Sequence, residues 1–260
     1  MISFQLVKQS HFQYNKGCYW HFLIMLVIIC SCSSNGLIEK SDQFAQIQFR
    51  EYLIENNTWN VKAAKNKWSE TIYRDTLHGN FGWKWDFSGE KDNPNEIKSY
   101  PEVIYGRKPY SGYKSTTPLL PKEIIKASFG IDYDYKIKAV GVYNISTDIS
   151  ITDSKNPNES NIRAKMMIWF KHENMPFFEH EHLKKAVIDG RNYALYIDTT
   201  HTGPEGKWVY IALMPDTFPS QGRIKLDEYF NYFISIGILK PDWFLSGRRK
   251  NSGFGQKHGW

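Results

Sequence analysis

The segment 161–171 places basic side chains, a methionine and a tryptophan at alternate positions, a spacing suited to a binding surface on a strand. Its middle alternates, so a strand here would place on one face Arg163, Lys165, Met167, Trp169 and Lys171. The other face would be apolar and typical of a core, with Ala164, Met166, Ile168 and Phe170. A face that mixes cations with Met and Trp is typical of a wet, aromatic-lined groove. We therefore expect Lys165 to lie at the centre of a binding surface.

Other titratable residues give weaker signals. We interpret four glutamates as solvated charges: Glu102, Glu159, Glu173 and Glu205. In the cluster 179–182, alternation would put His180 and His182 on one side, which is compatible with a metal site. The cluster lacks a third ligand at a recognisable spacing, so a solvated loop is favoured. The sequence predicts no metal and no organic cofactor.

Composition narrows the class of protein. The chain has 260 residues, of which 41% are hydrophobic and 16% aromatic, enough for one sizeable core. Aromatic residues favour strands and also form stacking surfaces for sugar rings. The net charge of +6 is mild, and no run of five or six cations occurs. Nucleic-acid binding is therefore not expected.

Residues 1–31 are typical of a targeting segment. Lys8 and Lys16 precede the apolar run 22–29, which is too short for a bilayer-spanning helix and has the length of a signal-peptide core. The run ends in Ile29-Cys30-Ser31-Cys32, which resembles a bacterial lipoprotein cleavage box and implies lipidation of Cys32. An ordinary signal peptide or a membrane anchor stays open as an alternative. We expect a lipid-anchored protein of the bacterial cell envelope, facing the periplasm or the exterior.

The remaining chain reads as a short tether, residues 32–43, and one domain, residues 44–260. All three cysteines lie in the leader and its cleavage box, so no disulfide is expected in the domain. One helix is predicted after residue 225, with Asp227 as its cap, an apolar stripe from Leu226 to Phe233, and Gly237 at its end. Short strands separated by turn residues predict an all-β sandwich or jelly roll. The predicted strands are 46–54, 68–76, 80–87, 97–106, 123–129, 132–140, 142–152, 161–171, 185–189, 191–198 and 207–214.

Several separated stretches resemble glycoside hydrolase family 12, the jelly-roll endo-β-1,4-glucanases and xyloglucanases. The matching blocks keep the family's order over about 44–247. They are Asn56-Asn57-Thr58-Trp59, Phe81-Gly82-Trp83-Lys84-Trp85, Lys98-Ser99-Tyr100-Pro101, Tyr143-Asn144-Ile145-Ser146-Thr147-Asp148, Met167-Ile168-Trp169-Phe170, Trp208-Val209-Tyr210 and 237–245. The resemblance implies a two-sheet antiparallel jelly roll with one helix on its convex side and a glycan cleft on its concave side.

The family's chemistry needs two glutamates, a nucleophile and an acid/base, about 5–5.5 Å apart. The resemblance puts Lys165 at the nucleophile position and Gly255 at the acid/base position, so both carboxylates are missing. It keeps Asp148 as the supporting carboxylate, which should face Lys165 across neighbouring strands and form an ion pair with it. The residues that it implies for substrate binding are Asn57, Trp59, Trp85, Met167 and Trp169. For the tryptophans, packing in the core is the alternative.

The last residues depart from the family pattern. From Gly247 onward strand alternation is lost and basic residues become frequent, and the family's closing strand is missing. Two explanations stay open: a gene frameshifted or truncated near codon 247, or a genuine non-catalytic relative that kept the groove.

The sequence thus predicts a monomeric cell-surface lipoprotein whose lineage hydrolyses β-1,4-linked glucan or xyloglucan. Hydrolysis by this chain is doubtful, because Lys165 and Gly255 replace the catalytic glutamates. Two alternatives are a non-catalytic β-glucan-binding lipoprotein and a lipoprotein that docks a protein partner.

Overall fold

The computed structural model describes residues 2–5, 36–50, 52–64, 67–87, 97–109, 119–178, 182–203 and 206–254, with residues 2–5, 63 and 247–254 as backbone only. Its strands are β1 (Ile2–Gln5), β2 (Leu37–Lys40), β3 (Gln46–Phe49), β4 (Tyr52–Glu55), β5 (Ser69–Asp75), β6 (Asn80–Asp86), β7 (Glu102–Gly106), β8 (Gly130–Ile137), β9 (Tyr143–Thr152), β10 (Ile162–Glu173), β11 (Lys184–Ile188), β12 (Arg191–Asp198), β13 (Thr202–Gly203), β14 (Gly206–Lys207), β15 (Val209–Pro215), β16 (Gln221–Lys225) and β17 (Phe244–Phe254). The helices are α1 (Pro121–Ala127) and α2 (Leu226–Ser235), with 3-10 turns at Val61–Ala63 and Glu159–Asn161.

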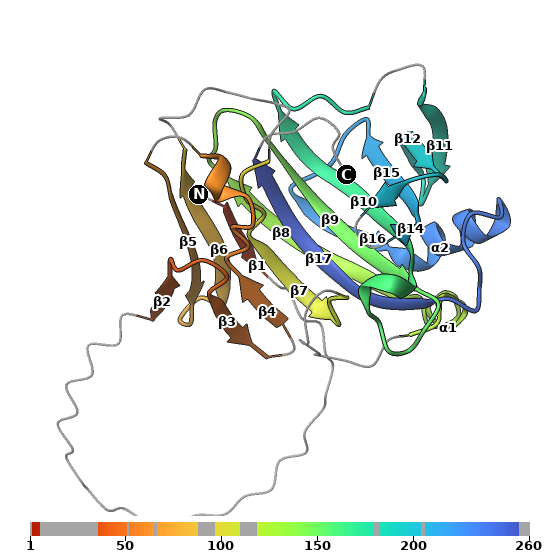
Figure 1. Cartoon of the computed structure of the whole chain (residues 1–260), viewed down its shortest axis with the longest axis horizontal. Coiled ribbons are helices and arrows are strands. Elements are labelled where there is room, and N and C mark those ends of the chain that lie inside the picture. The colour runs from red at the N-terminus through yellow and green to blue at the C-terminus, as the bar shows by residue number, and fades with distance from the viewer. Residues whose placement is uncertain are drawn as a thin grey trace, which may run out of the picture.

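Two large sheets form the body of the molecule (Figure 1). One has nine strands in the order β11-β12-β15-β10-β9-β17-β7-β4-β3, and the other has six in the order β16-β8-β1-β6-β5-β2. Neighbouring strands are antiparallel except β10 and β15, which run parallel. The predicted jelly-roll class is confirmed.

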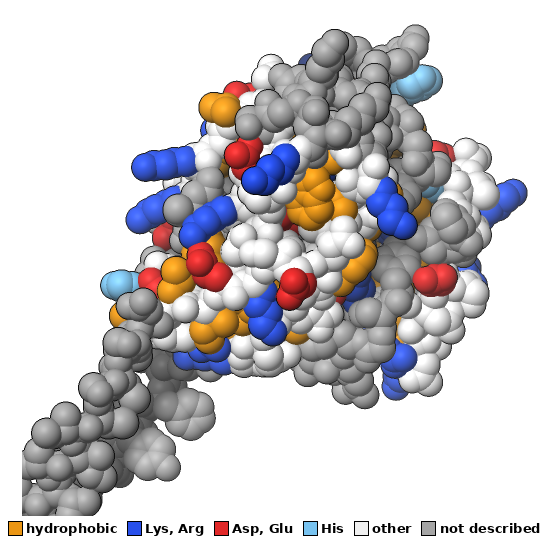
Figure 2. All heavy atoms as spheres, turned by 60° about the vertical axis from the view of Figure 1, so that its left-hand side comes forward, with side chains coloured by type: hydrophobic (Ala, Val, Ile, Leu, Met, Phe, Trp, Pro, Cys, Tyr) orange, Lys and Arg blue, Asp and Glu red, His pale blue; other side chains and the backbone are white. Residues whose placement is uncertain are grey.

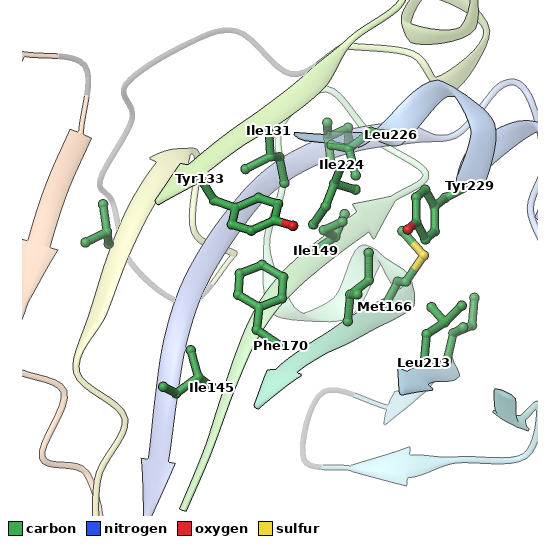
Figure 3. Packing of buried hydrophobic residues seen from close by; sticks show 14 of the residues in the cluster. Ile131, Tyr133, Ile145, Ile149, Met166, Phe170, Leu213, Ile224, Leu226 and Tyr229 are labelled. Carbon is green, nitrogen blue, oxygen red and sulfur yellow. The ribbon is translucent and has the colours of Figure 1, made fainter. Parts of the chain in front are cut away.

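The core lies between the sheets because alternate residues of both point inward. Ile72 and Trp83 come from the six-stranded sheet, whereas Ile149, Met166 and Leu213 come from the nine-stranded sheet, and all five are fully buried. In Figure 3, Tyr229 of α2 lies beside Met166, and Leu226 lies beside Ile224 of β16. Helix α2 thus packs on the core through Leu226 and Tyr229.

Helix α2 carries the predicted buried stripe, and Gly237 follows it with a φ of 73°. The predicted cap is wrong, because the helix begins at Leu226 and Asp227 lies inside its first turn. The prediction of a single helix is also wrong. Residues 121–127 form α1 instead of a strand, because Pro121 sets the first turn and the Glu123 side chain accepts from the backbone N–H of Leu120.

Three further predictions are corrected by the strands. Leu37–Lys40, expected in a flexible tether, pair with β5 as the edge strand β2. The expected strand 46–54 is a hairpin, since Arg50 has a φ of 53° and the chain turns between β3 and β4. Residues 247–254 are not irregular, because β17 runs through Phe254 between β9 and β7.

Most of the leader lies outside the described residues, and so does Cys32. Within it, Ile2–Gln5 forms β1, which pairs with β6 on one side and with β8 on the other. No helix in the described part of the chain is long and apolar enough to cross a bilayer.

Candidate glycan site

The centre of β10 has the predicted two faces. Ala164, Met166 and Ile168 are fully buried toward the core, while Lys165 and Met167 point to the opposite side and are half-buried. We call this opposite side of the nine-stranded sheet the site face. The residues that share it in the middle of the sheet are Lys165, Met167 and Trp169 of β10 with Ser146, Asp148 and Ser150 of β9.

The strand register corrects the predicted pairing of Lys165. The residue directly across from Lys165 on β9 is Ser150, whereas Asp148 lies across from Met167. Asp148 is therefore a diagonal neighbour of Lys165 on the same face, at a separation that long side chains can bridge. An ion pair between Lys165 and Asp148 stays a prediction.

Lys165 lies against an aromatic ring. Its ammonium nitrogen is 4.3 Å from the ring centroid of Trp208, a residue that is only 6% exposed. On the same ring lies His201, with centroids 4.2 Å apart, and the His201 Nδ1 is 3.4 Å from Asp198 Oδ2. Burial alone would raise the pKa of the Asp198 carboxyl, but hydrogen bonds from Thr200 and the nearby His201 lower it. Lys165 thus contributes a cation where the resemblance places a carboxylate nucleophile.

Met167 and Trp169 are less open than predicted. The Trp169 Nε1–H donates to Met167 Sδ at 3.1 Å, and the Tyr210 hydroxyl lies 3.6 Å from the same sulfur. Trp169 is 6% exposed because Phe177 packs edge-on against it, with centroids 5.1 Å apart. This burial favours the alternative of core packing for Trp169, and its stacking role stays a prediction. The sequence signal for this burial was the apolar segment 175–178, which follows β10 and packs on Trp169.

Tyr210 joins the site face from β15, where it pairs with Lys165. Its side chain is half-buried, and burial raises the pKa of its hydroxyl well above 10, with Asp148, Tyr100 and Tyr196 raising it further. The hydroxyl is thus a hydrogen-bond donor at any neutral pH. No site role was predicted for Tyr210 from the sequence. The alternation of Trp208-Val209-Tyr210 does put Trp208 and Tyr210 on one side of a strand.

Asn57 and Trp59 lie on the turn that follows β4. The Asn57 Nδ2–H donates to Glu102 Oε1 at 3.0 Å, and Trp59 is 40% exposed. Trp59 is thus open to a ligand, as predicted for a stacking residue. Trp85 is different, because it lies on β6 of the other sheet and packs against buried Tyr143 with centroids 6.3 Å apart. Its side chain is half-buried against the core, which favours the packing alternative, and its stacking role stays a prediction.

Glu102 was interpreted as a solvated charge, and this is wrong, since it is fully buried. The Lys108 ammonium lies 2.5 Å from Glu102 Oε1 and 2.5 Å from Glu55 Oε1, and both Glu55 and Lys108 are under 10% exposed. Buried charges are tolerated only when paired in this way. Nothing in the sequence pointed to this cluster, because Glu and Lys are usually solvated. The pairing of β4 with β7 places Glu55 across from Glu102 and so forms it.

The predicted acid/base position and most of the cluster 179–182 cannot be placed. Gly255 lies outside the described residues, as do Glu179, His180 and Glu181. Among the described residues no group of three or more His, Cys, Asp or Glu side chains could hold a metal ion. The backbone register does place β17 beside β9, with Arg249 across from Asp148. The sequence of β17, FLSGRRKNSGF, contains no aspartate or glutamate.

Comparisons with known proteins agree with this geometry. No curated protein matches the chain significantly. Among solved structures, a family 12 xyloglucanase from Bacillus licheniformis is 21% identical, with a TM-score of 0.71 over 84% of this chain and 94% of that one. An endoglucanase from Rhodothermus marinus is 16% identical, with a TM-score of 0.62 over 84% and 94%.

At these identities the structures establish a shared fold. A protein-family model, Glycosyl hydrolase family 12, matches residues 50–242, which is most of the chain. The match includes Asn57, Asp148, Lys165 and Trp208 and confirms the resemblance seen in the sequence. The chain therefore belongs to glycosyl hydrolase family 12.

Proposed function

We propose that this protein binds a β-1,4-linked glucan or xyloglucan on the site face without hydrolysing it. The observation that carries the proposal is the position of the Lys165 ammonium, 4.3 Å from the Trp208 ring centroid at the centre of that face. Family membership supports the class of ligand, because solved relatives are named as xyloglucanases and endoglucanases.

Retaining glycosidases hold two carboxylates about 5–5.5 Å apart, on either side of the scissile bond. Here the nucleophile position is a lysine, which when protonated has no lone pair to attack with. The acid/base partner has no substitute on β17, whose sequence lacks any carboxylate. Glu55 and Glu102 are bound to Lys108 and buried, so they cannot take over either role.

Features suited to binding remain. Trp59 offers an exposed ring, and the flat face of an aromatic ring packs well on the apolar face of a pyranose. Tyr210 offers a hydroxyl that stays protonated, and Asp148 is a half-buried acceptor on β9, which β10 separates from the strand of Tyr210. The face viewed in Figure 2 mixes Lys, Arg, Asp and Glu side chains without one dominant sign.

Two assays test this proposal. Release of reducing sugar from barley β-glucan or xyloglucan should not exceed that of a boiled control, and release above it would mean that hydrolysis persists. Affinity electrophoresis in gels that contain xyloglucan, mixed-linkage glucan or hydroxyethyl cellulose should retard the protein. If none of the three gels retards it, the glycan proposal fails and docking of a protein partner becomes the better function.

We also propose that the protein is lipid-anchored through Cys32. The cleavage-box sequence supports this, and radioactive palmitate should label the wild type but not the Cys32→Ser variant in a bacterial host. Cleavage before Cys32 would remove β1, which pairs with both β6 and β8. Mass spectrometry of the N-terminus of the membrane fraction therefore decides between a processed lipoprotein and a chain that keeps its first strand.

A further inference from the structure

A chain of polar side chains, buried except for Gln46, links β4 and β7 to the turn that presents Trp59. Gln46 Nε2–H donates to Glu55 Oε2 at 2.7 Å, and Lys108 joins Glu55 to Glu102. Glu102 Oε1 then accepts from both Lys108 and Asn57. Glu55 and Glu102 lie across from each other on the site face, since the alternate residues Ile54 and Val103 point into the core.

The chemistry of Glu102 fixes which way the Asn57 amide is turned. An ionised carboxylate only accepts hydrogen bonds, so the group that faces it must be the NH2 of the amide. The carbonyl oxygen Oδ1 must then point the other way. No hydrogen bond within the described part of the chain uses this oxygen, and it is not among the fully buried side-chain atoms that lack a partner. Asn57 is 9% exposed, so this oxygen is an acceptor that is not completely buried, two residues from exposed Trp59.

Lys108 supplies the positive charge that faces Glu102. With its ammonium 2.5 Å from each carboxylate, the two buried glutamates share one cation, and loss of that cation would leave both charges uncompensated. The backbone completes the arrangement, since the N–H of Tyr100 donates to the carbonyl of Asn57 at 2.8 Å. The turn is therefore held from β7 through both its backbone and its side chain.

We propose that Glu102 is a positioning residue for glycan binding. Its carboxylate, held by Lys108, orients the Asn57 amide so that Oδ1 accepts a hydrogen bond from a sugar hydroxyl of a glucan chain lying on Trp59. The inference rests on the proposed glycan-binding function and adds a specificity: residue 57 offers an acceptor and not a donor.

The test removes the acceptor that faces Asn57 and then restores it without the charge. In Glu102→Leu the side chain keeps about its size but accepts no hydrogen bond, so the orientation of the Asn57 amide is lost. In Glu102→Gln the oxygen stays beside the Lys108 ammonium, which only donates, and still accepts from Asn57 Nδ2–H. Glu39→Gln is the matched control, because Glu39 also pairs with a lysine, Lys84 at 2.6 Å, but on the exposed surface of the other sheet.

Titration calorimetry with the xyloglucan heptasaccharide should show affinity about tenfold weaker for Glu102→Leu, the size of one good hydrogen bond, and unchanged for Glu39→Gln. Glu102→Gln should keep most of the wild-type affinity. If Glu102→Leu fails to fold, Asn57→Asp serves instead, since its carboxylate is repelled by that of Glu102 and should weaken the affinity about as much. Unchanged affinity in a folded Glu102→Leu variant, or a Glu102→Gln variant as weak as Glu102→Leu, would overturn the inference.

A readout without ligand separates this inference from the proposed function. The side-chain NH2 signals of Asn57, identified in nitrogen-15 spectra by their loss in Asn57→Asp, should shift in Glu102→Leu and stay in place in Glu39→Gln. If the wild type binds no glucan but these signals shift, the proposed function fails and the positioning by Glu102 stands. Signals that do not move would overturn the positioning itself.

Discussion

The ammonium of Lys165 lies 4.3 Å from the centroid of the Trp208 ring. Trp208 directly precedes β15, the strand that pairs with β10 on the side opposite β9. Because Trp208 is almost completely buried, its ring shields the cation from water on one side, which strengthens a cation–π contact. The lysine is thus built into its surroundings, and a return to glutamate would not simply restore a nucleophile.

Substitution of Lys165 should therefore cost stability without giving activity. We expect Lys165→Met to lower the free energy of unfolding by about 1–2 kcal/mol, the value of a partly desolvated cation–π contact. Lys165→Glu should cost more, because it puts a carboxylate near Asp148 and on the negative face of Trp208. Urea unfolding measures both, and neither variant should release sugar from xyloglucan. Lys240→Met is the control, since exposed Lys240 lies 5.8 Å from Trp243 and should lose under about 0.5 kcal/mol.

Trp59 and Trp169 should separate binding from stability. Trp59→Ala should weaken binding of cellotetraose about tenfold and change the free energy of unfolding by under about 1 kcal/mol, because the ring is 40% exposed. Trp169→Ala should cost about 3–5 kcal/mol of stability, because its ring is buried under Phe177. Calorimetric binding and thermal melting of the same preparations give both numbers. The reverse pattern would mean that the segment 175–178 opens and that Trp169 is the residue on which glucan stacks.

The alternation of apolar residues predicted most of the strands, because one buried face imposes a period of two. It succeeded best in β9 and β10, where the face opposite the core stays polar. It failed at residues 121–127, where the run from Glu123 to Lys126 fits a short helix as well as a strand, and only Pro121 signalled the helix start. It also missed β17, since Arg248, Arg249 and Lys250 carry no apolar period and only pairing with β9 and β7 makes them a strand.

Site residues that belong to short local motifs could be predicted from the sequence. Site residues that meet only through the pairing of distant strands could not. Asn57, Trp59 and Lys165 could be found from local motifs. The network of Glu55, Glu102 and Lys108 could not, because these residues are 6 to 53 positions apart and meet only through strand pairing. The burial of Trp169 depends on how segment 175–178 folds, and a motif does not encode that.

Helix α2 should be the main clamp on the core-facing side of the nine-stranded sheet. Phe233 is fully buried, and the hydroxyl groups of Tyr193 and Tyr229 form a buried hydrogen bond between β12 and the helix. Phe233→Ala should destabilise the protein by about 3–5 kcal/mol, and Tyr229→Phe by about 1 kcal/mol. Ile236→Ala serves as control, since Ile236 is 47% exposed and should change little. Urea denaturation followed by tryptophan fluorescence measures all three variants, and a Phe233→Ala cost as small as that of the control would contradict the clamp.

Glu70 should make the stability of the protein fall as the pH rises. Burial raises the pKa of its carboxyl to about 8, although the hydrogen bond from Ser99 acts in the opposite direction. The folded protein therefore keeps a proton on Glu70 at pH values where the unfolded chain, with a pKa of 4.5, has lost it. The stabilisation is complete below pH 4.5, falls by about 1.4 kcal/mol per pH unit above that, and is lost as the pH passes 8.

Glu70→Gln tests this sign directly. The glutamine can still accept from Ser99 and has no proton to lose, so we expect the variant to be less sensitive to pH between about 5 and 8.5 and more stable than the wild type at about pH 8.5. Urea unfolding at several pH values in this range gives the two slopes, and their difference isolates Glu70 from every other titrating group. Glu39→Gln, at an exposed site, should keep the wild-type slope. Parallel slopes for the wild type and Glu70→Gln would show that the Glu70 carboxyl is already ionised in the folded protein at neutral pH.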